Sequence, residues 1–448
     1  MYETVIAGGQ VVTAGASFQA DVAIRGERIV AVGLGLEGQR VIDALGCYVI
    51  PGAVDAHVHL QMWAGRYRSS DTFASGTVAA ALGGTTTVID FVEPEDEQAM
   101  IAALVARRCE ADGQVAIDYA LHMTIPAWHA EYALSEIPAV MDAGIYSFKL
   151  YQAYRRLRLD DARLYATLKA LAHHGGLPIL HSENGPVIDL LRAEAVRGNH
   201  TEPVWHARTR PAELEGQAVS AALGLARLAG SPLYIVHVSC AQALEAVVSA
   251  QERGQVVYAE TCPQYLFLTE DELTGENGRL YICAPPLRTE TDQALLWGAV
   301  ERGHVQVIST DHCPFAAQEK VAEAVFAQVP GGLPSIEARL SLVHDSARRG
   351  LLTLNQWVAR CCTQPAQLFR LPHKGDVAPG FDADLVVFDP ERQVTLSSQW
   401  LHENVDWTPY EGISLGGWPR HVFSRGKWIV RHGEFHGPAG WGRFLFAG

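Results

Sequence analysis

The chain has 448 residues, and 48% of them are hydrophobic, which is enough to bury one large core or the cores of two or three ordinary domains. Its net charge of -15 argues against nucleic acids and anionic membranes as partners, because both select basic surfaces, and favours a small-molecule substrate. The eight cysteines include no CxxC pair, so neither a zinc ribbon nor a disulfide framework is predicted. The first residues lack the segments of a signal peptide and no stretch is apolar enough to span a membrane, so we expect a cytoplasmic protein.

Residues 1–50 alternate apolar and polar positions. Clear examples are Glu3–Thr13 and Asp21–Val32, with glycines between the runs. Alternation of this kind is typical of an antiparallel sheet that has one face in water. We therefore predict a sheet in this part of the chain.

From Pro51 onward the chain changes to short, nearly continuous apolar runs, each followed by a helix-like segment. This texture is typical of a parallel sheet that is covered by helices on its outside. The eight runs are Val49–Leu60, Thr85–Phe91, Ala116–Met123, Ile145–Tyr151, Pro178–Glu183, Leu233–Ser239, Val256–Thr261 and Val305–Asp311. Eight such alternations over about 300 residues predict a (β/α)8 barrel, and a doubly wound open sheet is the alternative.

Helical patterns lie between these runs. The clearest are Ala99–Ala111, Ala162–His174, Ala212–Leu228, Gln242–Arg253 and Asp292–Arg302. Glycine follows four of these five segments, where a helix favours a left-handed residue: Gly175, Gly230, Gly254 and Gly303.

The last part of the chain first continues as helix and then returns to strands. Ser335–Arg349, Leu354–Arg360 and Gln364–Arg370 have helical patterns, whereas alternation resumes from Gly375 and over Pro419–His432. Since neither end supplies many strands, we predict that residues 1–50 and 373–448 form one small β-sandwich domain beside a catalytic barrel of residues 51–372. The predicted fold class is therefore α/β, a (β/α)8 TIM barrel with a small β-sandwich domain built from both chain ends.

Candidate functional residues occur at the ends of the predicted barrel strands. His57 and His59 are two apart on an apolar run, so both imidazoles are expected on the same side of a strand, which suggests a metal site. Function in such barrels lies at the carboxyl ends of the strands. Further polar residues fall there: Lys149, His181, His237 and Asp311.

Lys149 is unusual because a cationic amine is unfavourable both on an apolar strand and beside metal ions. Desolvation and nearby cations favour its neutral form. A neutral amine can take up carbon dioxide and become a carbamate, an anionic ligand with two oxygens that can bridge two metals. The alternative is an ordinary lysine that forms a salt bridge with an aspartate or glutamate.

Nine stretches of the chain, spread over nearly its whole length, resemble the cyclic amidohydrolases of the amidohydrolase superfamily, and most of all the dihydropyrimidinase and D-hydantoinase branch. The matching stretches are Pro51–Leu60, Gly83–Phe91, Ser147–Tyr154, His181–Gly185, His206–Pro211, Val236–Cys240, Glu260–Leu266, Ala284–Arg288 and Thr310–Phe315. The resemblance implies two divalent metal ions, one on His57, His59 and Asp311 and one on His181 and His237. Lys149, carbamylated to N6-carboxylysine, would bridge them. Zinc suits these ligands, and manganese or cobalt can also occupy such a site.

The resemblance also implies a mechanism and a substrate site. A hydroxide that bridges the metals would attack the ring amide, the Tyr154 hydroxyl would stabilise the oxyanion, and Asp311 would carry the proton to the leaving nitrogen. The backbone at Ala284 and Gly331 would hold the imide edge of the ring. We expect Tyr151 and Arg158 to shape the pocket for the exocyclic substituent, unless Arg158 lies on a solvated loop.

The expected function is hydrolysis of the cyclic amide of hydantoins or 5,6-dihydropyrimidines to N-carbamoyl amino acids. Allantoinase is the main alternative, because Gln61, Arg66 or Arg158 could bind the ureido arm of allantoin. Dihydroorotase is less favoured, since Gln61 stands where that branch has an arginine. A non-catalytic relative of dihydropyrimidinase is disfavoured because every implied ligand is present. The family further implies a homotetramer.

Overall fold

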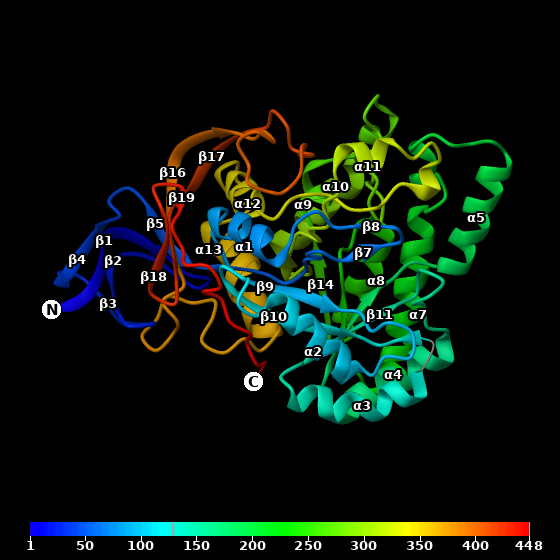
Figure 1. The fold of residues 1–448 in the computed structure, drawn as a ribbon, viewed down its shortest axis with the longest axis horizontal. Coiled ribbons are helices and arrows are strands. Elements are labelled where there is room, and N and C mark those ends of the chain that lie inside the picture. The colour runs from blue at the N-terminus through cyan, green and yellow to red at the C-terminus, as the bar shows by residue number, and fades with distance from the viewer. Residues whose placement is uncertain (128–129, 448) are drawn as a thin grey trace.

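The computed structural model describes residues 1–127 and 130–447, and it contains two large sheets. The ribbon has a β-rich part at one end, which carries the amino terminus, and a larger barrel with its helices at the other (Figure 1). Among the described residues, no helix is both long and apolar enough to cross a membrane.

The β-rich part is one nine-stranded sheet made from both ends of the chain. Its strands are β1 (Tyr2–Val12), β2 (Ser17–Arg25), β3 (Arg28–Gly33), β4 (Gly38–Asp43), β5 (Tyr48–Pro51), β16 (Leu385–Thr395), β17 (Ser414–Ser424), β18 (Lys427–Arg431) and β19 (Glu434–Phe435). Strands β1, β2 and β3 pair antiparallel as predicted, whereas β4 and β5 both pair parallel with β1. Antiparallel pairing of β5 with β16 joins the two chain ends. The exact domain boundaries stay a prediction.

The second sheet has eight parallel strands in chain order, as the barrel prediction requires. They are β6 (Ala53–Asp55), β9 (Thr85–Val92), β10 (Asp118–Thr124), β11 (Ser147–Tyr151), β12 (Leu177–His181), β13 (Leu233–Ile235), β14 (Val257–Thr261) and β15 (Val307–Ile308). A short hairpin of β7 (Trp63–Ala64) and β8 (Tyr67–Arg68) follows the first of them. Chain order and parallel pairing confirm the (β/α)8 fold class.

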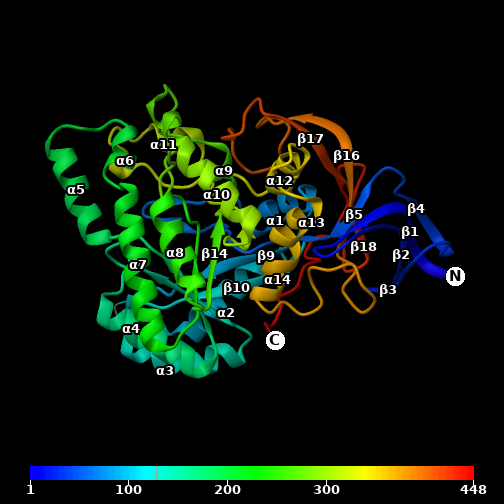
Figure 2. The same cartoon turned by 180° about the vertical axis from the view of Figure 1, so that it is seen from behind.

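Helices cover the outside of this sheet (Figure 2). The α-helices of the described residues are α1 (Phe73–Leu82), α2 (Met100–Ala111), α3 (Ala130–Asp142), α4 (Asp161–His174), α5 (Gly185–Arg197), α6 (Val204–Arg208), α7 (Ala212–Ala229), α8 (Ala241–Glu252), α9 (Pro263–Phe267), α10 (Glu290–Arg302), α11 (Ala317–Val321), α12 (Arg339–Arg348), α13 (Leu354–Val358) and α14 (Gln364–Leu368). A π-helical turn, Ala359–Thr363, joins the last two. Gly175, Gly230 and Gly303 end helices in the left-handed conformation, as predicted.

The seam between β15 and β6 closes by other means than a regular strand ladder. Val58 and His312 form an isolated parallel bridge, and the His59 N–H donates to the His312 carbonyl at 2.8 Å. Below them, the fully buried Arg339 donates to the carbonyls of Val54 and Ile308, at 2.9 and 2.8 Å. One guanidinium on α12 therefore links the first and last barrel strands.

The prediction of a single strand over Val49–Leu60 is wrong. The structure divides it into β5, which belongs to the nine-stranded sheet, and β6, which belongs to the barrel. Gly52 lies between them, and a Cβ atom there would come within 2.1 Å of the Thr86 hydroxyl oxygen. The chain therefore passes from one sheet to the other at a residue that must lack a side chain.

Candidate metal centre

The six predicted ligands all line one cavity of about 450 Å³. His181 is the last residue of β12, and Lys149 lies within β11. The other four follow their strands: His57 and His59 come after β6, His237 after β13 and Asp311 after β15. The prediction that His57 and His59 lie on the strand itself is therefore wrong, but the structure brings all six residues together.

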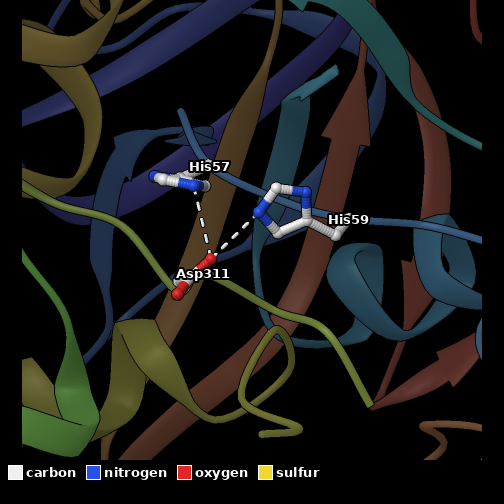
Figure 3. A group of neighbouring side chains, drawn as sticks. All are labelled: His57, His59 and Asp311. Atoms are coloured by element: carbon white, nitrogen blue, oxygen red, sulfur yellow. Dashed lines mark ion pairs between the residues drawn. The ribbon is translucent and has the colours of Figure 1, made fainter. Parts of the chain in front are cut away.

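Three of these residues form a compact group of potential ligand atoms, all within 4.8 Å of one another (Figure 3). Asp311 Oδ1 lies 3.3 Å from His57 Nε2 and 3.1 Å from His59 Nε2. The two imidazoles point toward the carboxylate from the segment after β6. Two nitrogens and one oxygen in this arrangement suit a divalent ion such as zinc.

His181 and His237 form a second pair beside the first group. Their ring centroids are 4.6 Å apart, and His237 lies 5.5 Å from the His57 ring. The His57 Nε2 and His237 Nδ1 atoms are buried and have no hydrogen-bond partner among the described residues. Buried polar atoms normally have partners, so these orphaned nitrogens fit a site that is completed by metal ions.

Burial also sets the protonation of these histidines. It holds the pKa values of His57 and His237 well below the usual range and also lowers the pKa of His181. Burial opposes ionisation of Asp311, but interaction with His57 and a hydrogen bond from His59 lower the pKa of its carboxyl. Neutral imidazoles and an ionised carboxylate are the forms that bind metals.

Lys149 is 1% exposed, and its ammonium nitrogen lies 5.0 Å from the Phe91 ring and 5.2 Å from the Tyr151 ring. No carboxylate of residues 1–127 and 130–447 lies within ion-pair distance of its nitrogen, so the salt-bridge alternative finds no direct partner there, although the charges of Asp311, Glu260 and Glu93 still act on it and raise its pKa in part. Burial lowers its pKa to about 8. The side chain is therefore a buried amine beside aromatic rings and four histidines, with carboxylates nearby that it does not pair with directly.

Glu260 is a residue of this site that the sequence analysis did not identify. It is the second-last residue of β14, and its carboxylate lies 2.5 Å from His57 Nδ1 and accepts a hydrogen bond from the Tyr234 hydroxyl at 2.8 Å. A carboxylate on the far ring nitrogen fixes the orientation of a ligating histidine. The sequence did contain a sign of this role. Glu260 lies near the carboxyl end of the seventh predicted run, Val256–Thr261, as the predicted ligands lie near the ends of theirs.

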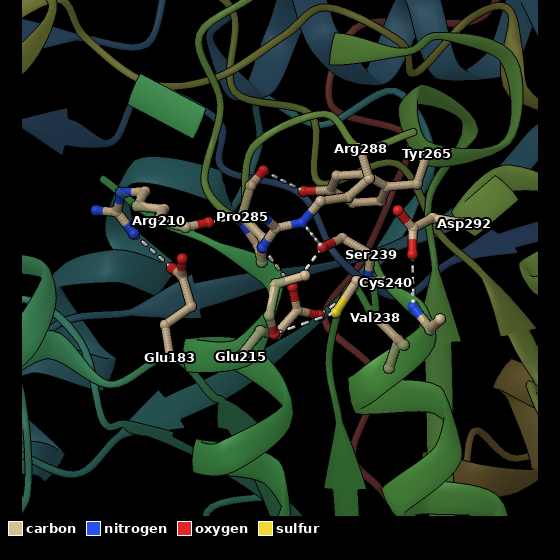
Figure 4. A network of polar contacts seen from close by, with 12 residues as sticks. Glu183, Arg210, Glu215, Val238, Ser239, Cys240, Tyr265, Pro285, Arg288 and Asp292 are labelled. Carbon is tan, nitrogen blue, oxygen red and sulfur yellow. Dashed lines mark hydrogen bonds and ion pairs between the residues drawn. The ribbon is translucent and has the colours of Figure 1, made fainter. Parts of the chain in front are cut away.

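A polar network holds the other side of the site (Figure 4). Glu183 accepts hydrogen bonds from His181 Nε2 at 2.7 Å and from Arg210 at 2.6 Å. Farther along, Arg288 donates to Glu215 at 2.9 Å and to the Ser239 hydroxyl at 3.0 Å. The network thus joins the segment after β12 to the segment after β13, where His237 lies.

Four of the five predicted substrate-binding residues line the cavity: Tyr151, Tyr154, Ala284 and Gly331. The Tyr154 ring lies 5.0 Å from the His181 ring, and the side chain is 39% exposed. The Tyr151 hydroxyl donates to Glu93 at 3.1 Å. Arg158 is not part of the lining; its guanidinium pairs with Asp189 at 2.9 Å, and its neighbours Arg156 and Leu157 line the cavity instead.

Three site residues have left-handed backbone conformations: Tyr154 with φ 60°, His237 with φ 37° and Asp311 with φ 52°. Side chains other than glycine rarely adopt this region, and such strain clusters at functional sites. The backbone conformation gives a second, independent indication that this cavity is the functional site.

Comparison with known proteins agrees with this geometry. The model of the Amidohydrolase family matches residues 48–429. The chain is 42% identical to a D-hydantoinase of Geobacillus stearothermophilus over 98% of this chain and 95% of that protein. Structures of a D-hydantoinase from Bacillus sp. AR9 and a dihydropyrimidinase from Brevibacillus agri superpose with TM-scores of 0.97, at 42% and 41% identity, and at least 98% of each chain is covered. The chain therefore belongs to the amidohydrolase family.

Proposed function

We propose that this protein is a cyclic amidohydrolase that opens hydantoins or 5,6-dihydropyrimidines to N-carbamoyl amino acids with two divalent metal ions. The observation that carries the proposal is the convergence of four histidines, Asp311 and the unpaired Lys149 in one cavity. The similarity of this protein, along nearly its whole length, to proteins named D-hydantoinase and dihydropyrimidinase supports the substrate class.

The histidines and Asp311 divide into two ligand groups. His57, His59 and Asp311 are the ligands for one ion, and His181 and His237 for the other. Zinc fits the donor set, and manganese or cobalt are the alternatives. Bound ions supply a Lewis acid for the substrate carbonyl and make an attacking water nucleophilic at neutral pH.

Lys149 completes this set as a carbamate. Its neutral amine adds to carbon dioxide and releases one proton, which leaves an anion with two oxygens in place of a cation. The burial of Lys149 and the lack of an ion pair to a described carboxylate support this modification, because a free ammonium there is unfavourable. A carbamate has the charge and the donor atoms that two neighbouring dications need.

The remaining residues act on the substrate and the proton. Tyr154 donates its hydroxyl to the carbonyl oxygen as negative charge develops there, and Asp311 accepts the proton of the attacking water and passes it to the leaving ring nitrogen. The lowered pKa of Asp311 keeps its carboxylate ionised and ready to accept that proton. The backbone at Ala284 and Gly331, which lines the cavity, holds the imide edge of the ring.

The test is turnover of dihydrouracil, 5-monosubstituted hydantoins, allantoin and dihydroorotate by purified protein loaded with zinc, manganese or cobalt. We expect hydrolysis of the first two classes, loss of activity with a chelator, and recovery on adding metal back. The residues suggested for the ureido arm of allantoin, Gln61, Arg66 and Arg158, are not in the cavity lining. Preference for allantoin, or equal activity without metal, would contradict the proposal.

We further infer from the family resemblance that the enzyme is a cytoplasmic homotetramer. Light scattering coupled to size-exclusion chromatography measures the mass of the assembly directly. A single 48.7 kDa species at working concentrations would rule out the tetramer.

A further inference from the structure

Three arginines line the cavity, and two of them have carboxylate partners. Arg210 pairs with Glu183 at 2.6 Å, and Arg156 pairs with Asp96 at 3.1 Å. Arg192, on α5, forms no ion pair with a carboxylate of the described residues. Its guanidinium donates instead to the Ala327 carbonyl at 2.7 Å, in the loop that forms one wall of the cavity.

Arg192 lacks a carboxylate partner because the acidic residue one turn before it in its own helix is already paired. Asp189 precedes Arg192 by three residues, a spacing at which opposite charges on a helix usually pair. Asp189 is taken by Arg158, whose guanidinium lies 2.9 Å from its carboxylate. Arg158 therefore influences the cavity from outside, because it engages the carboxylate that would otherwise neutralise Arg192.

The electrostatic surroundings of Arg192 agree with this view. Burial and then the nearby charge of Arg210 lower the pKa of its guanidinium, and Asp189 and Glu183 offset this only in part. A guanidinium keeps its proton under such conditions, since its ordinary pKa is above 12. The wall thus carries a half-buried positive charge with one neutral hydrogen-bond partner, and an anion there would be stabilised.

We propose that Arg192 forms a subsite for a carboxylate, or a similar anionic group, on the exocyclic substituent of the cyclic amide substrate. The inference rests on the proposed function and narrows it to rings that carry acidic side chains. The guanidinium offers paired N–H donors, which match a carboxylate better than they match a neutral amide. Arg192 therefore determines specificity and is separate from the residues that act on the ring.

The experiment compares two matched hydantoins of nearly the same size, 5-(2-carboxyethyl)hydantoin and 5-(2-carbamoylethyl)hydantoin, in which a charged carboxylate is replaced by a neutral amide. In the wild-type enzyme we expect the acid to have the higher kcat/KM. Arg192→Gln should lower the ratio of the two values by roughly 10-fold or more, the scale of a charge-assisted hydrogen bond, and leave the kcat/KM of the amide nearly unchanged. Arg158→Gln should move the ratio in the same direction but less, because it releases Asp189 to pair with Arg192.

Arg197→Gln is the matched control, because Arg197 is an exposed arginine of the same helix outside the cavity lining, and the ratio should not change. Binding of N-carbamoyl-D-glutamate and N-carbamoyl-D-glutamine by calorimetry supplies a readout that needs no turnover. If neither these hydantoins nor the other hydantoins and dihydrouracil are hydrolysed, but Arg192→Gln still abolishes the preference for the acidic ligand, the proposed function fails and the anion subsite stands. An unchanged preference in both assays overturns the subsite.

Discussion

Lys149 and Lys374 are both buried lysines, but their surroundings are opposite. Lys374 lies 2.6 Å from Asp118, 2.6 Å from Asp384 and 3.0 Å from Asp382, whereas Lys149 pairs with none of the described carboxylates. Accordingly, burial lowers the pKa of Lys149 to about 8, while the three aspartates overcome burial and raise the pKa of Lys374. The same residue type is thus a fixed cation in one place and a reactive amine in the other.

The two groups of closely spaced ligand atoms differ in the same way. Asp118, Asp382 and Asp384 have ligand atoms as close together as those of His57, His59 and Asp311. In the aspartate cluster, however, Lys374 already occupies the centre, and Arg425 lies 3.0 Å from Asp118. Proximity of ligand atoms alone therefore does not define a metal site. What distinguishes the cavity is that no lysine or arginine of the described residues forms an ion pair with Asp311, although the charge of Lys149 acts on it from farther away.

The largest expected effect is that of Lys149→Ala, which removes the proposed bridging group. Metal content should fall, and kcat/KM should drop by more than about 10⁴-fold, the scale seen when a group essential to the chemistry is lost. Acetate added with zinc should restore part of the rate by occupying the space that the side chain leaves. Elemental analysis and intact mass are the measurements.

Lys149→Arg is the control, because a guanidinium keeps its charge and cannot become a carbamate, so it should be as inactive as the alanine variant. The intact mass of the wild-type protein should exceed the mass calculated from its unmodified sequence by the mass of one carbon dioxide. Fully active enzyme with two metals and an unmodified lysine would refute the carbamate.

Next in size is Lys374→Met, which should destabilise the fold without affecting the metal. Arg425 still pairs with Asp118 and Arg28 with Asp382, but Asp384 loses its ion pair and stays buried. Leaving a buried charge uncompensated costs about 3–5 kcal/mol, which denaturant unfolding measures. Metal content and kcat should remain those of the wild type; loss of metal would mean that the two clusters are coupled.

The same variant has a pH dependence with a defined sign. Burial raises the pKa of Asp384 above that of the unfolded chain, so the folded state binds the extra proton and gains stability as the pH falls. Without Lys374 this effect should be larger. The difference in unfolding free energy between wild type and variant should therefore shrink from about pH 8 to about pH 5. A difference that grows on acidification would contradict this account.

Tyr154→Phe should lower kcat by about 10²-fold, the effect of losing one oxyanion donor, with metal content unchanged. Tyr151→Phe is the matched control, since that hydroxyl donates to Glu93 and the variant should lose less activity. Equal losses of kcat in the two variants would contradict the role of Tyr154 as the oxyanion donor.

The smallest effect is expected for Glu260→Gln, about 10- to 100-fold in zinc affinity, because it weakens the orientation of His57 and leaves the ligand in place. A competitive chelator titration measures this affinity. No change would show that His57 is held in place without the carboxylate.

Much of this architecture could be predicted from the sequence, because long apolar runs and helix-ending glycines report local structure directly. Strands β9 to β12 and helices α2, α4, α7, α8 and α10 lie within about two residues of the prediction at nearly every end. Periodicity misses α1, however, because Phe73 and Ala79–Leu82 are buried on several faces, so no polar stripe marks the helix. Helices after the third and fifth strands were expected from the β/α alternation, but no clear helical pattern was identified over α3 or α5.

The strand lengths and the cavity walls were harder to predict for a different reason. An apolar run records burial, not hydrogen bonding, so Leu233–Ser239 and Val305–Asp311 contain strands of only three and two residues. The six proposed metal ligands could be found from the sequence because they stand beside apolar runs. The roles of Arg158 and Arg192 were not predictable in this way. Arg158 pairs with Asp189 and Arg192 donates to the Ala327 carbonyl, and both are tertiary contacts that the sequence does not record.

The seam of the barrel has a consequence for how this protein can evolve. The Val58–His312 bridge closes the sheet between the first and last strands, and His57, His59 and Asp311 are the neighbours of the bridging residues in the chain. A mutation that changes one of these three proposed ligands should also change how the barrel closes. New substrate preferences should therefore arise in the loops away from the seam, such as the one that carries Tyr154, where sequence can vary while closure is preserved.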